Sequence, residues 1–249
     1  NSLEVEIIES VATFAFSEDH AYLAVHRTPP PAETEQNDGD TNSPVESIGS
    51  DLVVRDLNAK TDVQFANVSA FSWQDAGVLV AMTIAAEGQT GNGVQLFNPE
   101  TGELHTLTSG NSLFAGLSWR SEEDDLVVLR SHSRTGYEGD THDILTWHDL
   151  EANQTSALTY DPTTDANFPE DFRIVNERQP NWSDDGTAVF FGIRQWETSS
   201  DTNGESTKDT DGKDEEKPAD VDVWHSQDRR IIPMQKIQMQ RDRERNLLA

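Results

Sequence analysis

The sequence contains one segment that begins like the nucleophile motif of a serine hydrolase. Residues 116–120 read Gly-Leu-Ser-Trp-Arg, against the pattern G-x-S-x-G, in which the serine stands on a sharp turn between a strand and a helix. Both glycines are needed because strand and helix approach closely, and Arg120 occupies the second glycine position. The surrounding residues also fit a repeat that places Ser118 within a strand. We therefore predict no triad and no catalytic residue in this chain.

Patterns for metal or cofactor binding are also missing from the sequence. Its histidines are His20, His26, His105, His132, His142, His148 and His225. No two of them have the H-x-x-x-H spacing that places two ligands on one helix face. The segment from Asp209 resembles an EF-hand loop, but its fifth and sixth positions hold Lys213 and Asp214 instead of an oxygen ligand and a glycine. Because there is no cysteine, zinc–thiolate sites are excluded. We predict neither a metal nor a cofactor.

One predicted loop combines aromatic, basic and acidic side chains. Residues 131–140 read SHSRTGYEGD. Glu138 could pair with the amine of a peptide and Arg134 with a carboxylate. Loops between strands are generally polar, however, so this composition does not by itself identify a site. The sequence leaves the substrate-binding residues undetermined.

The charge of the chain limits its partners. It has 46 acidic and 18 basic residues, a formal net charge of −28. Segments 31–51 and 197–220 are especially acidic, but more than half of the excess charge lies outside them. A surface this acidic repels nucleic acid and anionic lipid, so we expect neither nucleic acid nor a membrane as a partner. The absence of cysteine does not fix the compartment, and we favour a periplasmic or secreted location over a cytoplasmic one.

Four segments of the chain share one pattern. In each, an aromatic residue is followed by a polar turn and then by a β-rich run, which predicts a strand end, a tight turn and a buried strand. The aromatic residues are Phe16, Trp73, Trp119 and Trp182. A strand–turn–strand pattern follows each of these segments, at residues 51–61, 93–107, 143–158 and 220–228. The repeating unit is therefore a meander of four strands.

Such a repeat is typical of a β-propeller. We predict an all-β fold, a β-propeller fragment of about four blades of four antiparallel strands. An immunoglobulin-like sandwich also has short alternating strands but would not repeat these two blocks four times. The blade-like repeats lie near residues 3–66, 67–109, 110–160 and 172–234. Polar insertions at 27–50 and 195–219 have the composition of disordered loops.

The two ends of the sequence do not resemble caps. Residues 235–249 are interpreted as a linker or as the start of a further blade. Because a terminal blade needs a neighbour or a cap to cover its apolar face, we expect the parent protein to continue in both directions.

Part of the repeat resembles a known class of propellers. The block Trp182-Ser183-Asp184-Asp185-Gly186, with the blade-ending pairs Leu107-Thr108 and Leu158-Thr159, resembles the repeat of TolB-type propellers. The stretch 220–230, followed by Met234-Gln235-Lys236 and Arg241-Asp242-Arg243, is similar to a segment of bacterial serine peptidases of the prolyl oligopeptidase and dipeptidyl peptidase family. In that family a propeller of seven or eight blades covers an α/β-hydrolase domain with a Ser-Asp-His triad.

The resemblance implies a function for the chain. It would be the non-catalytic propeller portion of a serine peptidase, gating the access of peptides to a C-terminal α/β-hydrolase domain absent from this chain. Its partners would then be that domain and peptide substrates. The alternative is a TolB-like propeller that acts as a protein- or peptide-binding module. A propeller enzyme with its active site in the central channel would need convergent carboxylates or histidines, which the sequence does not show.

Overall fold

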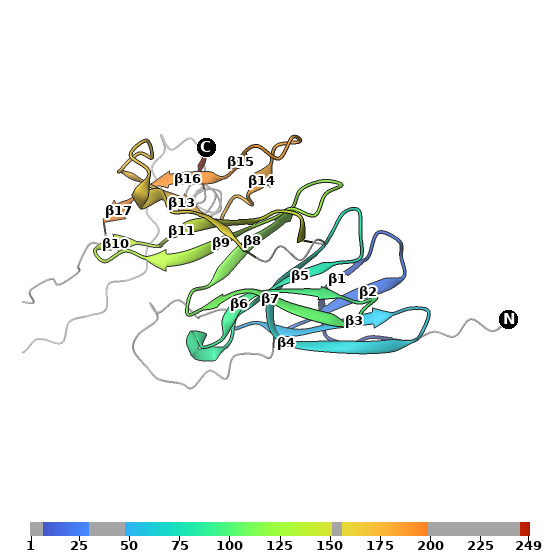
Figure 1. Ribbon diagram of the computed structural model, residues 1–249. Coiled ribbons are helices and arrows are strands. Elements are labelled where there is room, and N and C mark those ends of the chain that lie inside the picture. The colour runs from blue at the N-terminus through green and yellow to red at the C-terminus, as the bar shows by residue number, and fades with distance from the viewer. Residues whose placement is uncertain (1–6, 30–47, 151–155, 199–244) are drawn as a thin grey trace, which may run out of the picture.

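A computed structural model describes residues 7–29, 48–150, 156–198 and 245–249 (Figure 1). Its regular structure consists almost entirely of antiparallel strands. Among the residues described, helical structure is limited to short 3₁₀ turns such as η1 (Glu87–Gln89) and η3 (Pro162–Thr164). Within the described ranges, no helix has the length and apolar character needed to span a membrane.

The first seven strands form one sheet in chain order. They are β1 (Val11–Phe16), β2 (Tyr22–Arg27), β3 (Ser50–Asp56), β4 (Thr61–Trp73), β5 (Val80–Ile84), β6 (Asn92–Asn98) and β7 (Glu103–Gly110). Strand β4 belongs to two blades, because its residues up to Val68 pair with β3 and those from Val68 onward pair with β5. The register shifts between Val68 and Ala70, beside Asn67 with its positive φ of 58°. Strand β4 is thus the outer strand of the first blade and the inner strand of the second.

The third blade is a separate sheet of four strands in the order β12-β11-β9-β8. Its strands are β8 (Phe114–Trp119), β9 (Leu126–Ser133), β11 (Asp140–Trp147) and β12 (Leu158–Tyr160). The turn between β9 and β11 contains the short strand β10 (Tyr137–Glu138), which pairs with β17 (Glu197–Thr198) of the fourth blade.

The fourth blade is described in part. Its inner strand is divided into β13 (Phe172–Val175) and β14 (Asn181–Trp182), and the next strand into β15 (Val189–Phe190) and β16 (Gly192–Gln195). The last described segment, β18 (Leu247–Leu248), pairs antiparallel with β16. It therefore belongs to the fourth blade.

These sheets confirm the predicted fold class. Each blade is an antiparallel meander, and blades next to each other in the chain pack face to face, which is the arrangement of a β-propeller. The first predicted insertion, residues 27–50, falls between β2, which ends at Arg27, and β3, which begins at Ser50. The predicted third strand at 220–228 and most of the second insertion lie outside the described residues. The blade boundaries stay a prediction.

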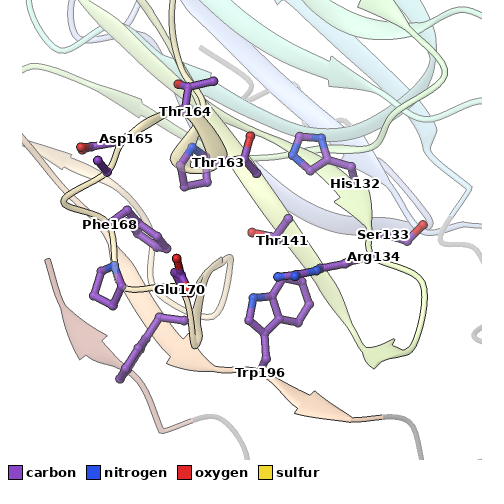
Figure 2. A pocket seen from close by; sticks show the side chains of 14 residues that line it. His132, Ser133, Arg134, Thr141, Thr163, Thr164, Asp165, Phe168, Glu170 and Trp196 are labelled. Carbon is purple, nitrogen blue, oxygen red and sulfur yellow. The ribbon is translucent and has the colours of Figure 1, made fainter.

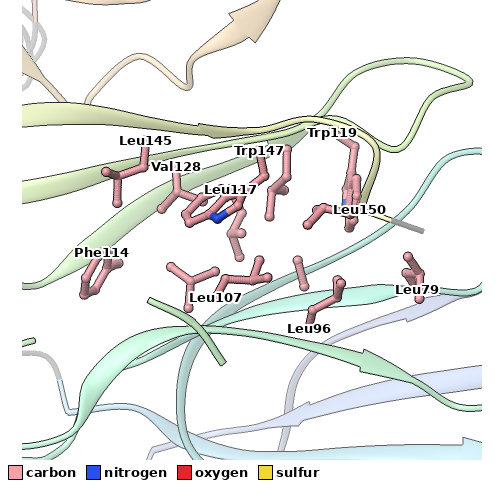
Figure 3. Close-up of a cluster of buried hydrophobic side chains, with 13 residues drawn as sticks. Leu79, Leu96, Leu107, Phe114, Leu117, Trp119, Val128, Leu145, Trp147 and Leu150 are labelled. Atoms are coloured by element: carbon pink, nitrogen blue, oxygen red, sulfur yellow. The ribbon is translucent and has the colours of Figure 1, made fainter. Parts of the chain in front are cut away.

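Strand β9 shows how the apolar residues build the core. Leu126, Val127, Val128 and Leu129 are all fully buried. Successive side chains of a strand point to opposite faces. Leu126 and Val128 accordingly pack in the cluster shared with the second blade, whereas Val127 and Leu129 pack in the cluster shared with the fourth. Figure 3 shows the first of these clusters, in which Trp147 and Leu145 of β11 face Leu96 and Leu107 of the second blade.

A repeated hydrogen bond joins neighbouring blades. The indole N–H of Trp73 donates to the carbonyl of Ala15 at 3.1 Å, and that of Trp119 donates to the carbonyl of Ser72 at 3.1 Å. Both acceptors directly precede the aromatic residue of the preceding blade. The aromatic residues found by the repeat thus do more than fill space, because they align one inner strand with the next.

Candidate functional site

A large cavity lies at the junction of the third and fourth blades (Figure 2). Its volume is about 820 Å³. It is lined by residues 132–134 and 141 of the third blade, by 162–166 and 168–170 of the connection between the blades, and by 172 and 196 of the fourth. The lining combines aromatic and proline side chains with a few charged and hydroxyl groups, as is usual in ligand sites of this size.

The connection that forms one wall is held by its own aspartates. The side chain of Asp161 accepts hydrogen bonds from the backbone N–H and the hydroxyl of Thr163, at 2.8 and 2.6 Å. Asp165 accepts from the backbone N–H of Asn167 at 2.9 Å and from the hydroxyl of Tyr160 at 3.0 Å. These bonds lower the pKa of both carboxyl groups, Asp161 through Thr163 above all and Asp165 through the backbone of Asn167. The wall is therefore ordered without a ligand.

The same contacts shift the pKa of Tyr160. Burial raises the pKa of its phenol to about 12, and the hydrogen bond to Asp165 acts in the same direction. Tyr160 therefore stays a neutral donor over the whole physiological pH range. It fixes the position of Asp165 beside the cavity.

The opposite wall is a group of rings and guanidinium groups. The guanidinium carbon of Arg134 lies 4.6 Å from the ring centre of Tyr137 and 5.5 Å from that of Trp196. The two ring centres are 5.0 Å apart. Arg173 approaches the same indole, with its guanidinium carbon 5.6 Å from the ring centre. The pairing of β10 with β17 brings Tyr137 and Trp196 together, although they are far apart in the sequence.

Arg173 also lines a second, smaller cavity of about 260 Å³. Arg173 is 6% exposed. Its Nη1 donates to the backbone carbonyl of Asp140, while its Nε has no hydrogen-bond partner. Burial lowers the pKa of Arg173, and the neighbouring charge of Arg194 adds to this. Gly139 makes room for the side chain, since a Cβ there would lie 2.8 Å from Nη2 of Arg173.

His142 completes the polar part of this junction. Its Nδ1 lies 2.8 Å from the carbonyl of Ile174 in β13, so that the protonated nitrogen donates across the two blades. The side chain is 3% exposed, and burial lowers its pKa. Beside it, Arg194 and Glu177 form an ion pair at 3.0 Å.

The structure places Arg134 and Glu138, the two residues of loop 131–140 that could pair with a peptide, in different surroundings. Arg134 lines the large cavity, whereas Glu138 lies on β10 opposite Glu197 and is not part of the lining. The aromatic residues Phe168, Phe172 and Trp196 were not singled out from the sequence. Nothing in the repeat marks them, because they lie in the connection and at the strand ends.

The serine of the incomplete hydrolase motif lies in a strand. Ser118 is part of β8 and pairs with Val127 of β9. Gly116 has a φ of 68°, and a Cβ at this position would lie 2.7 Å from Cδ of Pro180. The glycine is therefore needed for the contact between two blades. The close packing against Pro180 therefore accounts for Gly116, and no nucleophile elbow is needed to explain it.

The described histidines make structural contacts. His26 lies 2.8 Å from the carbonyl of Val68, and His132 and His148 lie 3.0 and 3.2 Å from carboxylates of their own blade. Within the described ranges, no three His, Asp or Glu side chains are grouped so as to hold a metal ion. His225 and the Asp209 segment lie outside these ranges. The expectations of no catalytic, metal or cofactor site stay predictions.

Comparison with known proteins finds likeness to solved structures but no matching sequence family. No protein-family model and no curated protein matches the chain. Among solved structures, it is similar to the β-propeller domain of the Trilobed protease from Pyrococcus furiosus, which is described as having an open velcro topology. The sequence identity is 15% and the TM-score 0.43, over 76% of this chain and 51% of the other. The chain thus spans about half the length of that structure.

Proposed function

We propose that this chain is the non-catalytic propeller portion of a serine peptidase, and that it binds peptides at the junction of its third and fourth blades. The observation that carries the proposal is the cavity of about 820 Å³ at this junction. Its volume lies in the range of small-molecule and peptide side-chain sites, roughly 300–1,000 Å³. One of its walls is held by hydrogen bonds within the chain, which favours a site that exists before a ligand binds.

The chemistry of the lining supports a peptide as the ligand. Phe168, Phe172 and Trp196 offer apolar surface for side chains, while Thr163 and Thr164 offer hydroxyl groups for backbone amides. Nucleic acid is disfavoured by the net charge of −28. The resemblance of residues 220–230 to prolyl oligopeptidase-family peptidases supports the further step, that bound peptides are passed to a hydrolase domain outside this chain.

Peptide binding can be tested by filling the cavity. Ala166 lines it and is exposed, so Ala166→Trp adds bulk without removing a described hydrogen bond. We expect this change to weaken the binding of fluorescently labelled peptides of about eight residues by more than tenfold, as measured by fluorescence anisotropy. Ala59→Trp, at an exposed turn of the first blade, is the matched control and should leave binding unchanged. Equal binding by both variants would overturn the proposed site.

The peptidase part of the proposal needs a separate test. Because Ser118 lies in a strand, the chain alone should not react with a serine-directed fluorophosphonate. A longer protein that contains this chain should be labelled, at the serine of a G-x-S-x-G elbow. Labelling of any serine within residues 1–249 would contradict the non-catalytic role. A longer protein without such an elbow would favour the TolB-like binding module, which shares the peptide site but not the hydrolase.

A further inference from the structure

Arg134 lines the cavity and offers a positive charge that a ligand could contact. It is exposed, and no carboxylate among the described residues forms an ion pair with it. This is unexpected in a chain with 46 acidic and 18 basic residues, where an exposed arginine easily finds an acidic neighbour. Its contacts are instead with the rings of Tyr137 and Trp196. Ring contacts use the flat face of a guanidinium and leave its five N–H donors available at the edge.

The two walls of the cavity differ in charge. Arg134 and Trp196 lie on one side, while Asp165 and Phe168 lie on the other (Figure 2). Asp165 already accepts hydrogen bonds from Asn167 and Tyr160, and His132 on the first side is 3.0 Å from the carboxylate of Asp143. Among the charged side chains near the cavity, Arg134 therefore has the most donors to offer a ligand.

We propose that the cavity selects peptides that carry a carboxylate, and that Arg134 binds this carboxylate through a two-pronged hydrogen-bonded pair while the aromatic side chains hold the neighbouring residue. The proposal rests on the proposed function for the ligand being a peptide. A carboxylate matches the planar fork of a guanidinium. Arg173, on the same indole, adds a second positive charge behind the site.

A singly charged group fits this site better than a phosphate. The net charge of −28 and the acidic side chains of Asp165 and Glu170 on the lining repel a dianion more strongly than a monoanion. The carboxylate itself has two sources, the C-terminus of the peptide or an acidic side chain. The chemistry at Arg134 is the same for both, so the two are separated by experiment.

The test compares peptides that differ only in charge. An octapeptide with one glutamate and a free C-terminus is measured beside its C-terminal amide and its Glu→Gln version, by fluorescence anisotropy with the complete chain. We expect one of the two neutralised peptides to bind at least tenfold more weakly, and the one that does so identifies the source. The difference should shrink as salt is raised, because exposed charge pairs are screened.

Two variants assign the selectivity to Arg134. Arg134→Gln should bind all three peptides equally, and Arg134→Lys should recover only part of the preference, because an ammonium group lacks the two-pronged geometry. Arg55→Gln is the matched control, since it removes the same charge from the first blade, where Arg55 pairs with Asp62 at 2.6 Å. It should keep the full preference.

The outcomes separate this inference from the proposed function. If no peptide binds, the proposed function itself fails. If all three peptides bind the unaltered chain equally well, the peptide site stands and the selection of a carboxylate is overturned. A preference that survives in Arg134→Gln would overturn the role of Arg134.

Discussion

The junction between the second and third blades differs in kind from the junction between the third and fourth. The first is closed by thirteen buried apolar residues and by the hydrogen bond from Trp119 to Ser72. Among the described residues, the second has six buried apolar residues, and the equivalent indole nitrogen, Nε1 of Trp182, is buried without a partner. Polar side chains and two cavities occupy the rest of it.

This difference shows that the same repeating unit can form a junction filled with apolar side chains or a junction that contains a cavity. The same four-stranded unit builds both junctions, so the fold alone does not require a cavity. The third and fourth blades are joined by a longer connection, residues 161–171, in which Asp161 and Asp165 form their own turns. In place of an indole, the side chain of Gln179 donates to the carbonyl of Leu117 at 2.6 Å. Among the described residues, the junction of the third and fourth blades thus has fewer buried apolar side chains and contains a cavity.

The largest expected effect compares one truncation in each junction. Leu126 and Ile174 are both fully buried. Leu126→Ala should lower the free energy of unfolding by about 4 kcal/mol, because its closely packed surroundings cannot collapse into the space. Ile174→Ala should lower it by only about 2 kcal/mol, at the lower end for such changes, since the neighbouring polar cavity can relax or hydrate. Chemical denaturation measures both, and equal losses would show that the two junctions are packed alike.

A smaller effect is expected from the indole nitrogens. Trp119→Phe removes the donor to Ser72 and should lower the free energy of unfolding by about 1 kcal/mol beyond the effect of the smaller ring. Trp182→Phe removes a buried N–H that has no acceptor. Because no hydrogen bond is lost, the free energy of unfolding should be nearly unchanged. The two side chains are similarly buried, at 8% and 7% exposure, which makes them a matched pair. A larger loss at Trp182 would contradict the difference.

The smallest effect concerns pH. Burial lowers the pKa of His142 below its value of about 6.5 in an unfolded chain. As the pH falls below 6.5, the unfolded chain therefore takes up a proton before the folded one, and stability is lost. The melting temperature should fall between pH 7 and pH 5, by less in His142→Gln than in the unaltered chain.

The repeat pattern predicted the blades because each blade must satisfy the same local rules. The turn after the aromatic residue of the first and fourth blades is an example: Ser17 donates to Asp19 at 2.6 Å, and Ser183 donates to Asp185 at 2.7 Å. The bonds to Asp185 from Ser183 and then Thr187 lower the pKa of this carboxyl group to about 2. Such turns depend on residues two positions apart, so the sequence shows them directly.

The site depends on residues that are far apart, and the sequence did not reveal it. The sequence singled out Arg134 because its loop mixes aromatic, basic and acidic residues. Its contact with Trp196, which directly precedes β17, depends on the pairing of β10 with β17. In the second and third blades, the position that follows the aromatic residue holds Gln74 and Arg120 instead of a serine. Gln74 instead donates to Asp124 of the next blade, a contact that no local pattern contains. These contacts depend on which distant strands lie side by side, and a single sequence does not reveal that pairing.

The shared strand β4 has a mechanical consequence. Its 13 residues run from the edge of the first blade into the centre of the second without an intervening linker. A hinge requires a few residues whose backbone angles can change freely, and every residue from Thr61 to Trp73 is part of the same strand. The first two blades are therefore expected to move as one rigid body. Relative rotation of blades would then require a change in another connection, such as residues 161–171, which contribute to the lining of the cavity.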